Sequence, residues 1–385
     1  MHSCPVCDST STEVFLERCR VPVHQNLVLE APQTARAVTR GDLRFAFCHD
    51  CGFVFNTAFD MGKLSYGDRY DNTQDCSLYF GGYLDGLARY LLQQKRLNRH
   101  CIVEVGCGKG SFLRRLVEPP ESKNVGYGFD PSYVGPESTL DGRLRFERRY
   151  FGPDCTHVKA EAVVCRHVIE HVPNPRRLVE TVRQALAGTH TGRVFFETPC
   201  VEWILRNHVI WDFFYEHCSL FSRASLRTLF EKAGFTVDSV RHIFGGQYLW
   251  MEARLLESRP VVSKNSGAIH DLTLQFVDTE HSLVQRWGET IARLAESGQV
   301  AIWGAGAKGV TFANLVDQEC RLIDCVIDVN PRKQGRFIPG TAHPIVNYCE
   351  IPGRGIEAVV LMNPIYREEN EGLLDQAGIQ VKLVA

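Results

Sequence analysis

The alternation of apolar and polar positions divides the chain into stretches of different character. Up to about residue 58 the chain is rich in turn residues and punctuated by cysteines, and the polar, aromatic stretch from Asp60 to Phe80 is typical of a connecting segment. From about Gly81, short apolar runs alternate with helical patterns, which predicts a doubly wound parallel sheet. We predict a helix near Leu84–Leu92 and strands at Cys101–Val105, Gly126–Phe129, Ala162–Cys165 and Gly192–Glu197.

The same alternation restarts near the end of the chain. Residues 257–268 are polar, contain Pro and Gly, and are typical of a linker. A helical pattern runs from about His270 to Ala295, and strands are predicted at Val300–Trp303, Cys325–Asp328, Ala358–Met362 and Gln380–Val384. We therefore predict an α/β protein with an N-terminal module and connector at 1–80, a Rossmann-like domain at 81–257, and a linker helix with a second Rossmann-like domain at 258–385.

Composition and charge exclude some classes of partner. The 385 residues carry a formal net charge of −2 and the pI is 6.7, so the chain lacks the basic surplus that binding a phosphate backbone requires, and we expect no nucleic acid partner. No apolar run approaches the ~20 residues of a membrane span, and the first residues lack the apolar core of a signal peptide. We therefore expect no membrane partner and a cytoplasmic location. The 15 cysteines fit a reducing compartment that holds metal-bound and free thiols.

Four cysteines near the N-terminus form two C-x₂-C pairs. Each pair is followed by turn residues, and a C-x₂-C turn aims two thiolates at one point. Two such turns complete a tetrahedron with no position left open for water, which is typical of a structural zinc site. The expected zinc ligands are Cys4, Cys7, Cys48 and Cys51.

A glycine-rich loop follows the first strand of the predicted central sheet, in the sequence IVEVGCGKGSFL. Glycines at alternate positions let the backbone turn sharply and approach a ligand closely, and the following helix offers free N–H groups to an anion. An acid at the end of the next strand is placed to accept both ribose hydroxyls of a nucleoside. The pattern predicts a class I methyltransferase domain with S-adenosylmethionine bound at Glu104, Gly106, Gly108, Gly110 and Asp130.

More polar residues follow the strand predicted at Ala162–Cys165, in the sequence RHVIEH. Because ligands bind at the carboxyl ends of strands in such sheets, we expect Arg166 and His167 to face the cofactor. His167 and His171 are four positions apart and would share one face of a helix. For His171, a role facing the substrate and a structural role both remain open.

The order of the motifs resembles that of a known family. A four-cysteine module precedes the VEVGCGKG loop, the sequence YEHCSLFS follows at Tyr215–Ser222, and the last domain opens with WGAGAK at Trp303–Lys308. This order resembles the three-domain, zinc-containing C-methyltransferases of deoxysugar biosynthesis, which methylate a carbon next to the keto group of a nucleotide-linked sugar. The resemblance implies a methyltransferase with a small-molecule acceptor of this class.

The resemblance also implies catalytic residues. Family members carry them in a Y-x-E-H-x-x-x-F-S segment, which corresponds to Glu216 and His217 here. Carbon becomes nucleophilic once a base removes the proton beside a carbonyl, and histidine titrates near neutral pH. Two positions depart from the family, because Phe214 stands where the family has tyrosine and Phe244 opens a segment that reads H-G-G in the family. We expect His217 as the base, surrounded by Glu216, Tyr215 and His171.

A second glycine-rich turn, GAGAKG, follows the strand at Val300–Trp303, and Asp328 ends the next strand. Taken alone, this pattern indicates a dinucleotide-binding domain. Too little chain follows for a second catalytic domain, and members of the resembled family use this domain to shape the substrate cleft. We therefore expect the turn to hold a phosphate of the substrate, with Gly304, Gly306, Lys308 and Asn363 as substrate-binding residues.

The sequence leaves three alternatives open. The chain could be an NAD-dependent oxidoreductase that uses its C-terminal domain, with the methyltransferase-like domain as a relic. It could be a non-catalytic zinc-module adaptor, although the intact glycine-rich loop and Asp130 argue against that interpretation. Within the methyltransferases, O- or N-methylation of another small metabolite competes with C-methylation, because a histidine base would serve those acceptors too.

Overall fold

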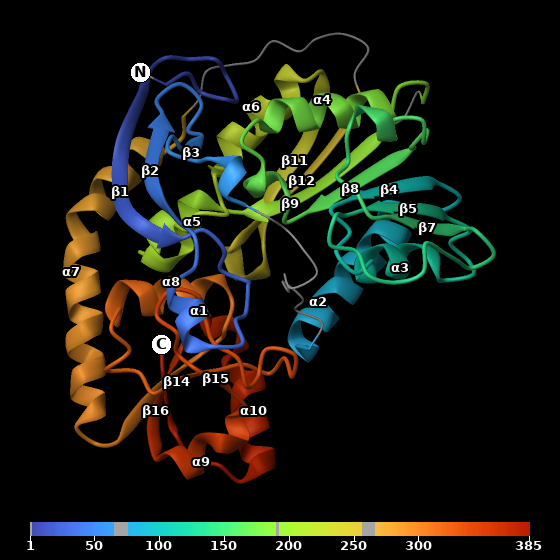
Figure 1. Cartoon of the computed structure of the whole chain (residues 1–385). Helices are drawn as coiled ribbons and strands as arrows, with labels where there is room; N and C mark the ends of the chain where they lie inside the picture. Colours follow the sequence, from blue (N-terminus) through green and yellow to red (C-terminus); the bar gives the residue numbers. More distant parts are fainter. Residues whose placement is uncertain (1, 65–75, 190–191, 256–265) are drawn as a thin grey trace.

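The computed structural model describes residues 2–64, 76–189, 192–255 and 266–385 as an α/β protein with three separate sheets. Figure 1 shows the N-terminal sheet and the long helix α7 on one side, the central sheet on the other, and the C-terminal domain below both. The predicted fold class, with two Rossmann-like parts behind a cysteine-containing module, is confirmed. Among the described residues, no helix combines the length and the apolar character needed to cross a bilayer.

The N-terminal sheet is antiparallel, with the strand order β1–β2–β3–β10. Its short last strand, β10, lies between β9 and β11 in the sequence, so this sheet includes a strand from the stretch of chain that forms the central sheet. Helix α1 (Pro32–Arg36) lies in the connection between the first two strands. The strands are β1 (Thr12–Pro22), β2 (Arg40–Cys48), β3 (Val54–Asn56) and β10 (Ser219–Leu220).

The central sheet has eight strands in the order β11–β12–β9–β8–β4–β5–β7–β6. The five from β9 to β7 are parallel, while β12 and β6 run antiparallel to their neighbours. The four strands predicted from sequence are present, and the antiparallel edge was not foreseen. The bounds are β4 (Cys101–Val105), β5 (Val125–Phe129), β6 (Ser138–Thr139), β7 (Leu144–Glu147), β8 (Ala162–Arg166), β9 (Arg193–Pro199), β11 (Phe235–Ile243) and β12 (Tyr248–Leu255).

Helices cover both faces of the central sheet, and their ends follow local capping chemistry. Ser77 caps α2, Asn174 with Pro175 opens α4, and Ser222 with Ser225 forms a capping box for α6. The predicted helix near Leu84–Leu92 is α2, which ends in a π-helical turn. The helices are α2 (Leu78–Arg89), α3 (Ser111–Val117), α4 (Pro175–Ala185), α5 (Val201–Arg206) and α6 (Arg223–Lys232).

The C-terminal domain is built on a five-stranded parallel sheet in the order β15–β14–β13–β16–β17. This is the strand order of a mononucleotide-binding half extended by two strands. The strands are β13 (Gln299–Trp303), β14 (Cys325–Ile327), β15 (Ile345–Val346), β16 (Ile356–Leu361) and β17 (Lys382–Val384), and the helices are α8 (Ala307–Val316), α9 (Ile351–Arg354) and α10 (Arg367–Ala377).

Helix α7 (Ile269–Ala295) joins the three sheets. Its first half packs against β1 and α5, and its second half packs against α8 and β13. The buried Arg18 of β1 donates to Glu280 of α7 at 2.6 Å and to the carbonyls of Ile210 and Phe213. Most of the linker predicted at 257–268, up to residue 265, lies outside the described residues. The helix predicted after it, from about His270 to Ala295, is confirmed as α7.

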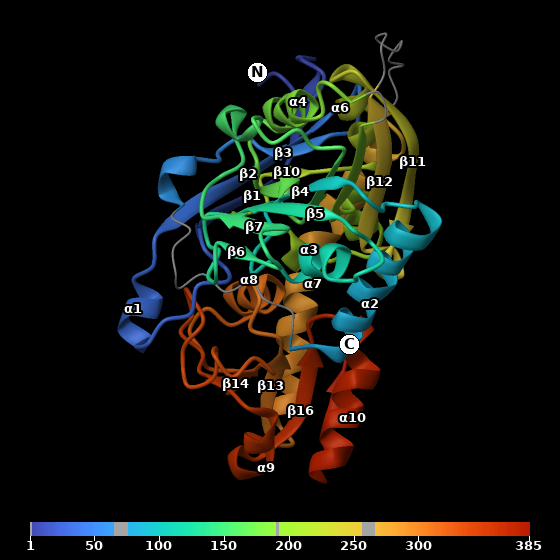
Figure 2. The same ribbon diagram turned by 90° about the vertical axis from the view of Figure 1, so that its right-hand side faces the viewer.

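The central and C-terminal parts also meet at the start of α2. Figure 2 shows α2 lying directly above α10. The carboxylate of Glu369 on α10 accepts from the Ser77 hydroxyl and from the Leu78 backbone N–H, both at 2.6 Å. An anionic side chain therefore caps the positive end of α2 from the other domain.

Candidate active site

Four thiols meet at the edge of the N-terminal sheet. The Sγ atoms of Cys4 and Cys51 are 3.7 Å apart, those of Cys7 and Cys48 are 3.5 Å apart, and all four lie within 4.8 Å of one another. A tetrahedral zinc ion with Zn–S bonds of about 2.3 Å places its sulfur ligands about 3.8 Å apart. The two measured Sγ pairs are close to this spacing, and the four predicted cysteines form a cluster that could hold a metal ion.

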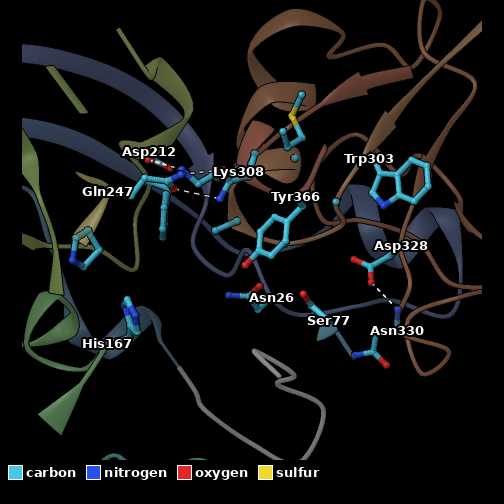
Figure 3. A pocket seen from close by; sticks show the side chains of 18 of the residues that line it. Asn26, Ser77, His167, Asp212, Gln247, Trp303, Lys308, Asp328, Asn330 and Tyr366 are labelled. Atoms are coloured by element: carbon cyan, nitrogen blue, oxygen red, sulfur yellow. Dashed lines mark hydrogen bonds and ion pairs between the residues drawn. The ribbon is translucent and has the colours of Figure 1, made fainter. Parts of the chain in front are cut away.

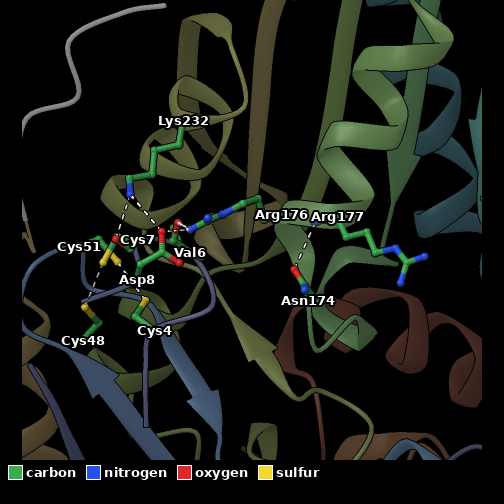
Figure 4. A network of polar contacts seen from close by, with 10 residues as sticks. All are labelled: Cys4, Val6, Cys7, Asp8, Cys48, Cys51, Asn174, Arg176, Arg177 and Lys232. Atoms are coloured by element: carbon green, nitrogen blue, oxygen red, sulfur yellow. Dashed lines mark hydrogen bonds and ion pairs between the residues drawn. The ribbon is translucent and has the colours of Figure 1, made fainter. Parts of the chain in front are cut away.

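The cysteine loop is fastened to the helices of the central domain, as Figure 4 shows. Arg176 of α4 donates to the Asp8 carboxylate at 2.7 Å and to the Val6 carbonyl at 2.9 Å. Lys232 of α6 donates to the Cys7 carbonyl at 2.9 Å. The loop that carries Cys4 and Cys7 thus docks on two helices that also cover the central sheet.

A cavity of about 320 Å³ opens at the carboxyl ends of β4, β5 and β8. It lies where ligands bind in sheets of this kind. Gly110 was also expected at the cofactor. It is the N-cap of α3 and is not among the described residues that line the cavity. The expected cofactor residues that line the cavity are Glu104, Gly106, Gly108, Asp130, Arg166 and His167.

The three glycines of the loop all have positive φ, but they differ in what an added Cβ would meet. A Cβ on Gly106 would lie 2.1 Å from the side chain of Val168, and one on Gly110 would lie 2.5 Å from the ring of Phe146. A Cβ on Gly108, where φ is +54°, would meet no described atom within 4 Å. Gly108 is therefore the position at which the backbone leaves open space for a ligand.

Two carboxylates support this loop. Asp130 accepts from the Gly108 N–H at 2.8 Å and from the Ser132 N–H and hydroxyl at 2.7 and 2.6 Å, which fixes the carboxylate at the rim of the cavity. Glu104 is buried and accepts from the Leu113 N–H at 3.1 Å. Burial raises the pKa of Glu104 to about 8, against the opposing charge of Arg166.

A buried charge network lies beneath the cavity, centred on Glu197. Its carboxylate accepts from the Tyr83 hydroxyl at 2.8 Å, from Arg166 Nε at 2.6 Å and from His167 Nε2 at 3.1 Å. Burial alone would raise the pKa of Glu197, but Arg166 and His167 lower it to about 2. Burial would lower the pKa of His167, but the charges of Glu197 and Glu170 raise it to about 9. His167 is therefore a cation at neutral pH, held between two carboxylates.

A second cavity of about 280 Å³ lies between the three parts of the protein. Figure 3 shows His167 near one end and Trp303 and Asp328 at the other, with Asn26 between them. His167 and His171 line both cavities, so the two cavities meet at these histidines.

The predicted catalytic segment forms a turn at this meeting point. The His217 N–H donates to the Phe214 carbonyl at 3.3 Å, and both residues line the second cavity. The His217 ring centroid lies 4.8 Å from that of His171. Burial, together with the proximity of His171, His167 and Lys308, lowers the pKa of His217 well below 6.5. His217 is therefore a neutral imidazole that can accept a proton.

The structure places the other two residues of the segment outside the described lining of both cavities. Tyr215 and Glu216 occupy the corner of the turn. The Tyr215 hydroxyl accepts from the Asp60 N–H at 2.9 Å, and Glu216 accepts from the Gln25 N–H at 2.8 Å. Both side chains hold the N-terminal segment, from which the adjacent Asn26 reaches the second cavity.

The far end of the second cavity is formed by the C-terminal glycine-rich turn. The Ala305 N–H donates to Asp328 at 2.8 Å, which repeats the link between Gly108 and Asp130 in the central domain. Lys308 is paired with Asp212 at 2.6 Å. The expected substrate-binding residues that line this cavity are Gly304, Gly306, Lys308 and Asn363.

Several residues of the second cavity escaped the sequence analysis. Asn26 and Tyr248 belong to no motif, and Tyr248 begins a strand that was not predicted. Gln247 forms a reciprocal amide pair with Asn363, at 2.9 and 3.1 Å, across the boundary with the C-terminal domain. Asp328, by contrast, is recognisable in the sequence as the acid that ends the strand after the glycine-rich turn.

Comparisons with known proteins agree with this organisation. Residues 78–240 match the methyltransferase domain family, and residues 271–376 match the C-methyltransferase C-terminal domain family. The C-methyltransferase NovU of Streptomyces niveus is 30% identical over 205 residues, which cover 49% of this chain and 48% of NovU. The match therefore spans about half the length of this curated relative.

Solved structures with similarity to the chain include two methyltransferases. The 1,6-didemethyltoxoflavin-N1-methyltransferase of Burkholderia thailandensis aligns with a TM-score of 0.36 and 14% identity, covering 47% of this chain and 82% of that one. The magnesium protoporphyrin IX methyltransferase of Synechocystis PCC 6803 aligns with a TM-score of 0.37 and 16% identity, covering 49% and 91%.

The two family matches follow one another along the chain in the order that the motifs predicted, with the cysteine cluster ahead of them. The resemblance inferred from the sequence is confirmed at this level. The chain thus contains a stretch that matches a methyltransferase domain, followed by a stretch that matches the C-methyltransferase C-terminal domain.

Proposed function

We propose that the protein is an S-adenosylmethionine-dependent C-methyltransferase whose acceptor is a nucleotide-linked keto-deoxysugar. The observation that carries this proposal is the meeting of the two cavities at His167 and His171, with the neutral His217 in the wall of the second cavity. A methyl donor and an acceptor would meet there beside a proton-accepting group. The C-methyltransferase C-terminal domain match favours carbon over oxygen or nitrogen as the methylated atom.

The first cavity fits the cofactor. Gly108 leaves the space that a bound molecule would fill, and Asp130 presents a carboxylate fixed by three hydrogen bonds to ribose hydroxyls. S-adenosylmethionine, when bound, supplies a methyl group on a positively charged sulfur. Glu104 lies under the turn and fixes the start of α3.

The second cavity fits an acceptor with a polar, anionic tail. At its far end Asp328 is held by the Ala305 N–H, in the arrangement that places Asp130 at the cofactor. Helix α8 begins there without a side-chain cap, so its first N–H groups are available to a phosphate, beside Lys308, which is ion-paired with Asp212. Because the cavity continues from this turn to His217, the turn is better explained by a substrate nucleotide than by a separate NAD site.

The keto-sugar then occupies the end of the cavity beside the histidines. His217 takes the proton from the carbon next to the carbonyl, which makes that carbon nucleophilic. The low pKa of His217 keeps it in the free-base form at neutral pH. The surrounding wall, which includes Phe214 and Ile204, restricts access of water to the reacting carbon.

The four cysteines hold a structural zinc ion in this proposal. Their Sγ spacing supports tetrahedral binding, and the protein supplies all four ligands, so no position remains for catalysis. The metal orders the turns before β1 and after β2. The same sheet carries the segment that brings Asn26 to the acceptor cavity.

The test is a comparison of His217→Asn and His217→Gln with the parent protein, using a thymidine-diphosphate-linked keto-deoxyhexose as the acceptor. Loss of the base should slow methyl transfer by about 10²–10⁴ while the affinity for S-adenosylhomocysteine and the melting temperature stay near the parent values. The exposed His157, remote from both cavities, provides the matched control His157→Asn. Turnover within a few-fold of the parent in both His217 variants would contradict the proposed base.

A further inference from the structure

The hydroxyl of the half-buried Tyr248 differs from those of four other tyrosines. Those of Tyr83, Tyr90 and Tyr133 donate to Glu197, Glu252 and the Pro136 carbonyl, and that of Tyr215 bonds to the Asp60 backbone. Tyr248 lines the acceptor cavity, and within the described part of the chain its hydroxyl has no hydrogen-bond partner. Because Tyr248 lines the cavity and tyrosine hydroxyls normally take a hydrogen-bond partner, this one is placed to bond to a ligand there.

The ring of Tyr248 is fixed where the two cavities meet. It stacks on Phe244 with centroids 4.8 Å apart and planes at 5°, and it meets the His167 ring edge-on at 4.5 Å. Its backbone pairs with Pro199 at the end of β9. The hydroxyl is therefore carried by a rigid ring beside a histidine that lines both cavities.

Surrounding groups keep this hydroxyl protonated. Burial raises the pKa of Tyr248 well above 10, and Tyr366, Glu197 and Asp212 raise it further. Across the neutral range the group is thus a hydrogen-bond donor and not a phenolate. A donor is the group that a developing negative charge on oxygen requires.

We propose that the Tyr248 hydroxyl donates the hydrogen bond that holds the carbonyl oxygen of the acceptor as that oxygen becomes an enolate. The inference rests on the proposed function. When His217 takes the proton, the electron pair of the broken C–H bond forms a carbon–carbon double bond. The π electron pair of the carbonyl group moves to its oxygen. When that carbon takes the methyl group, the carbonyl re-forms and the sulfur of the donor keeps the pair of the broken methyl–sulfur bond. His217 then releases its proton to solvent.

Phe214 is another aromatic residue of the same cavity. Its ring centroid lies 4.0 Å from that of His217. Phe214 has no hydroxyl, whereas Tyr248, at the start of strand β12, brings one to the cavity.

The experiment compares Tyr248→Phe with the parent protein on a thymidine-diphosphate-linked keto-deoxyhexose. Removing an oxyanion donor costs about 10²–10³ in rate, so we expect this loss in kcat. We also expect it in the exchange of the carbon-bound proton for deuterium, measured with S-adenosylhomocysteine in place of the donor. The affinity for S-adenosylhomocysteine and the melting temperature should not change. Tyr127→Phe, which removes a hydroxyl outside both cavities, is the matched control.

A second variant separates a chemical from a structural role. Adding Phe214→Tyr to Tyr248→Phe returns a hydroxyl to the same cavity and should recover part of the exchange rate, which restored packing would not do. Exchange and turnover of Tyr248→Phe within a few-fold of the parent would overturn the assignment and leave the proposed function intact. A parent protein that neither exchanges nor methylates the probe would overturn both.

Discussion

Gly108→Ala is the substitution that most sharply separates cofactor binding from fold stability. Gly108 has φ of +54°, a left-handed conformation that costs an L-residue about 1–2 kcal/mol. The added methyl meets no described atom within 4 Å, so no steric cost adds to the backbone cost in the free protein. That open space lies in the cavity assigned to the cofactor, and a methyl group there would push the ligand away from the loop. We expect the affinity for S-adenosylhomocysteine to fall at least about tenfold, or 1.4 kcal/mol.

Gly378→Ala is the matched control. Gly378 ends α10 with φ of +66°, also has no described atom within 4 Å of an added Cβ, and lies outside the described lining of both cavities. Both variants should lower the melting temperature by similar amounts, and only Gly108→Ala should weaken binding in isothermal titration calorimetry. Equal affinity of the two variants for S-adenosylhomocysteine would refute the placement of the cofactor at this loop.

Two further predictions concern the metal and the charge network. Freshly purified protein should contain one zinc ion per chain, and Cys48→Ser should lower both the zinc content and the melting temperature; metal analysis that finds no zinc in the parent protein would contradict this. The rise of the His167 pKa from 6.5 to about 9 contributes roughly 3 kcal/mol to the free energy of unfolding. This contribution should be complete below pH 6.5 and lost as the pH rises through 9. Denaturation across that range should show the loss in the parent protein, and a His167→Gln variant that shows the same loss would exclude His167 as its source.

The fold could be predicted where apolar runs alternate locally with helical patterns. The strands at Cys101–Val105 and Gln299–Trp303 are buried parallel strands, whose continuous apolar runs are visible without knowledge of their partners. The strands β1 to β3 and the antiparallel edge were missed, because their pairing depends on distant segments. The clearest case is β10, a strand of two residues that exists only because Val54 and Phe55 of β3 pair with it.

The parts of the site that could be predicted are those whose position follows from the local backbone of a sequence motif. The glycine-rich loop and Asp130 lie together because a strand, a turn and the next strand place them so. The YEH sequence singled out His217, but it did not indicate where the side chains of Tyr215 and Glu216 point. In the turn from Phe214 to His217, the end residues face the cavity, while Tyr215 and Glu216 at the corner project into the N-terminal segment.

The acceptor residues that were missed come from three separate parts of the chain. Asn26 precedes the first helix, Tyr248 follows a glycine turn in the central domain, and Trp303 ends a strand of the C-terminal domain. Their association depends on α7 and on contacts such as that between Arg18 and Glu280, which hold the parts together. No local pattern in the sequence carries this information.

The central claim is that the methyl group is transferred to carbon next to a carbonyl. The direct measurement uses S-adenosylmethionine labelled with carbon-13 in the methyl group and a thymidine-diphosphate-linked keto-deoxyhexose labelled with carbon-13 in the sugar, followed by carbon NMR of the product. The account predicts one-bond coupling between the new methyl carbon and the sugar carbon adjacent to the carbonyl. A transferred methyl carbon without one-bond coupling to any sugar carbon would contradict it and would assign the transfer to oxygen or nitrogen.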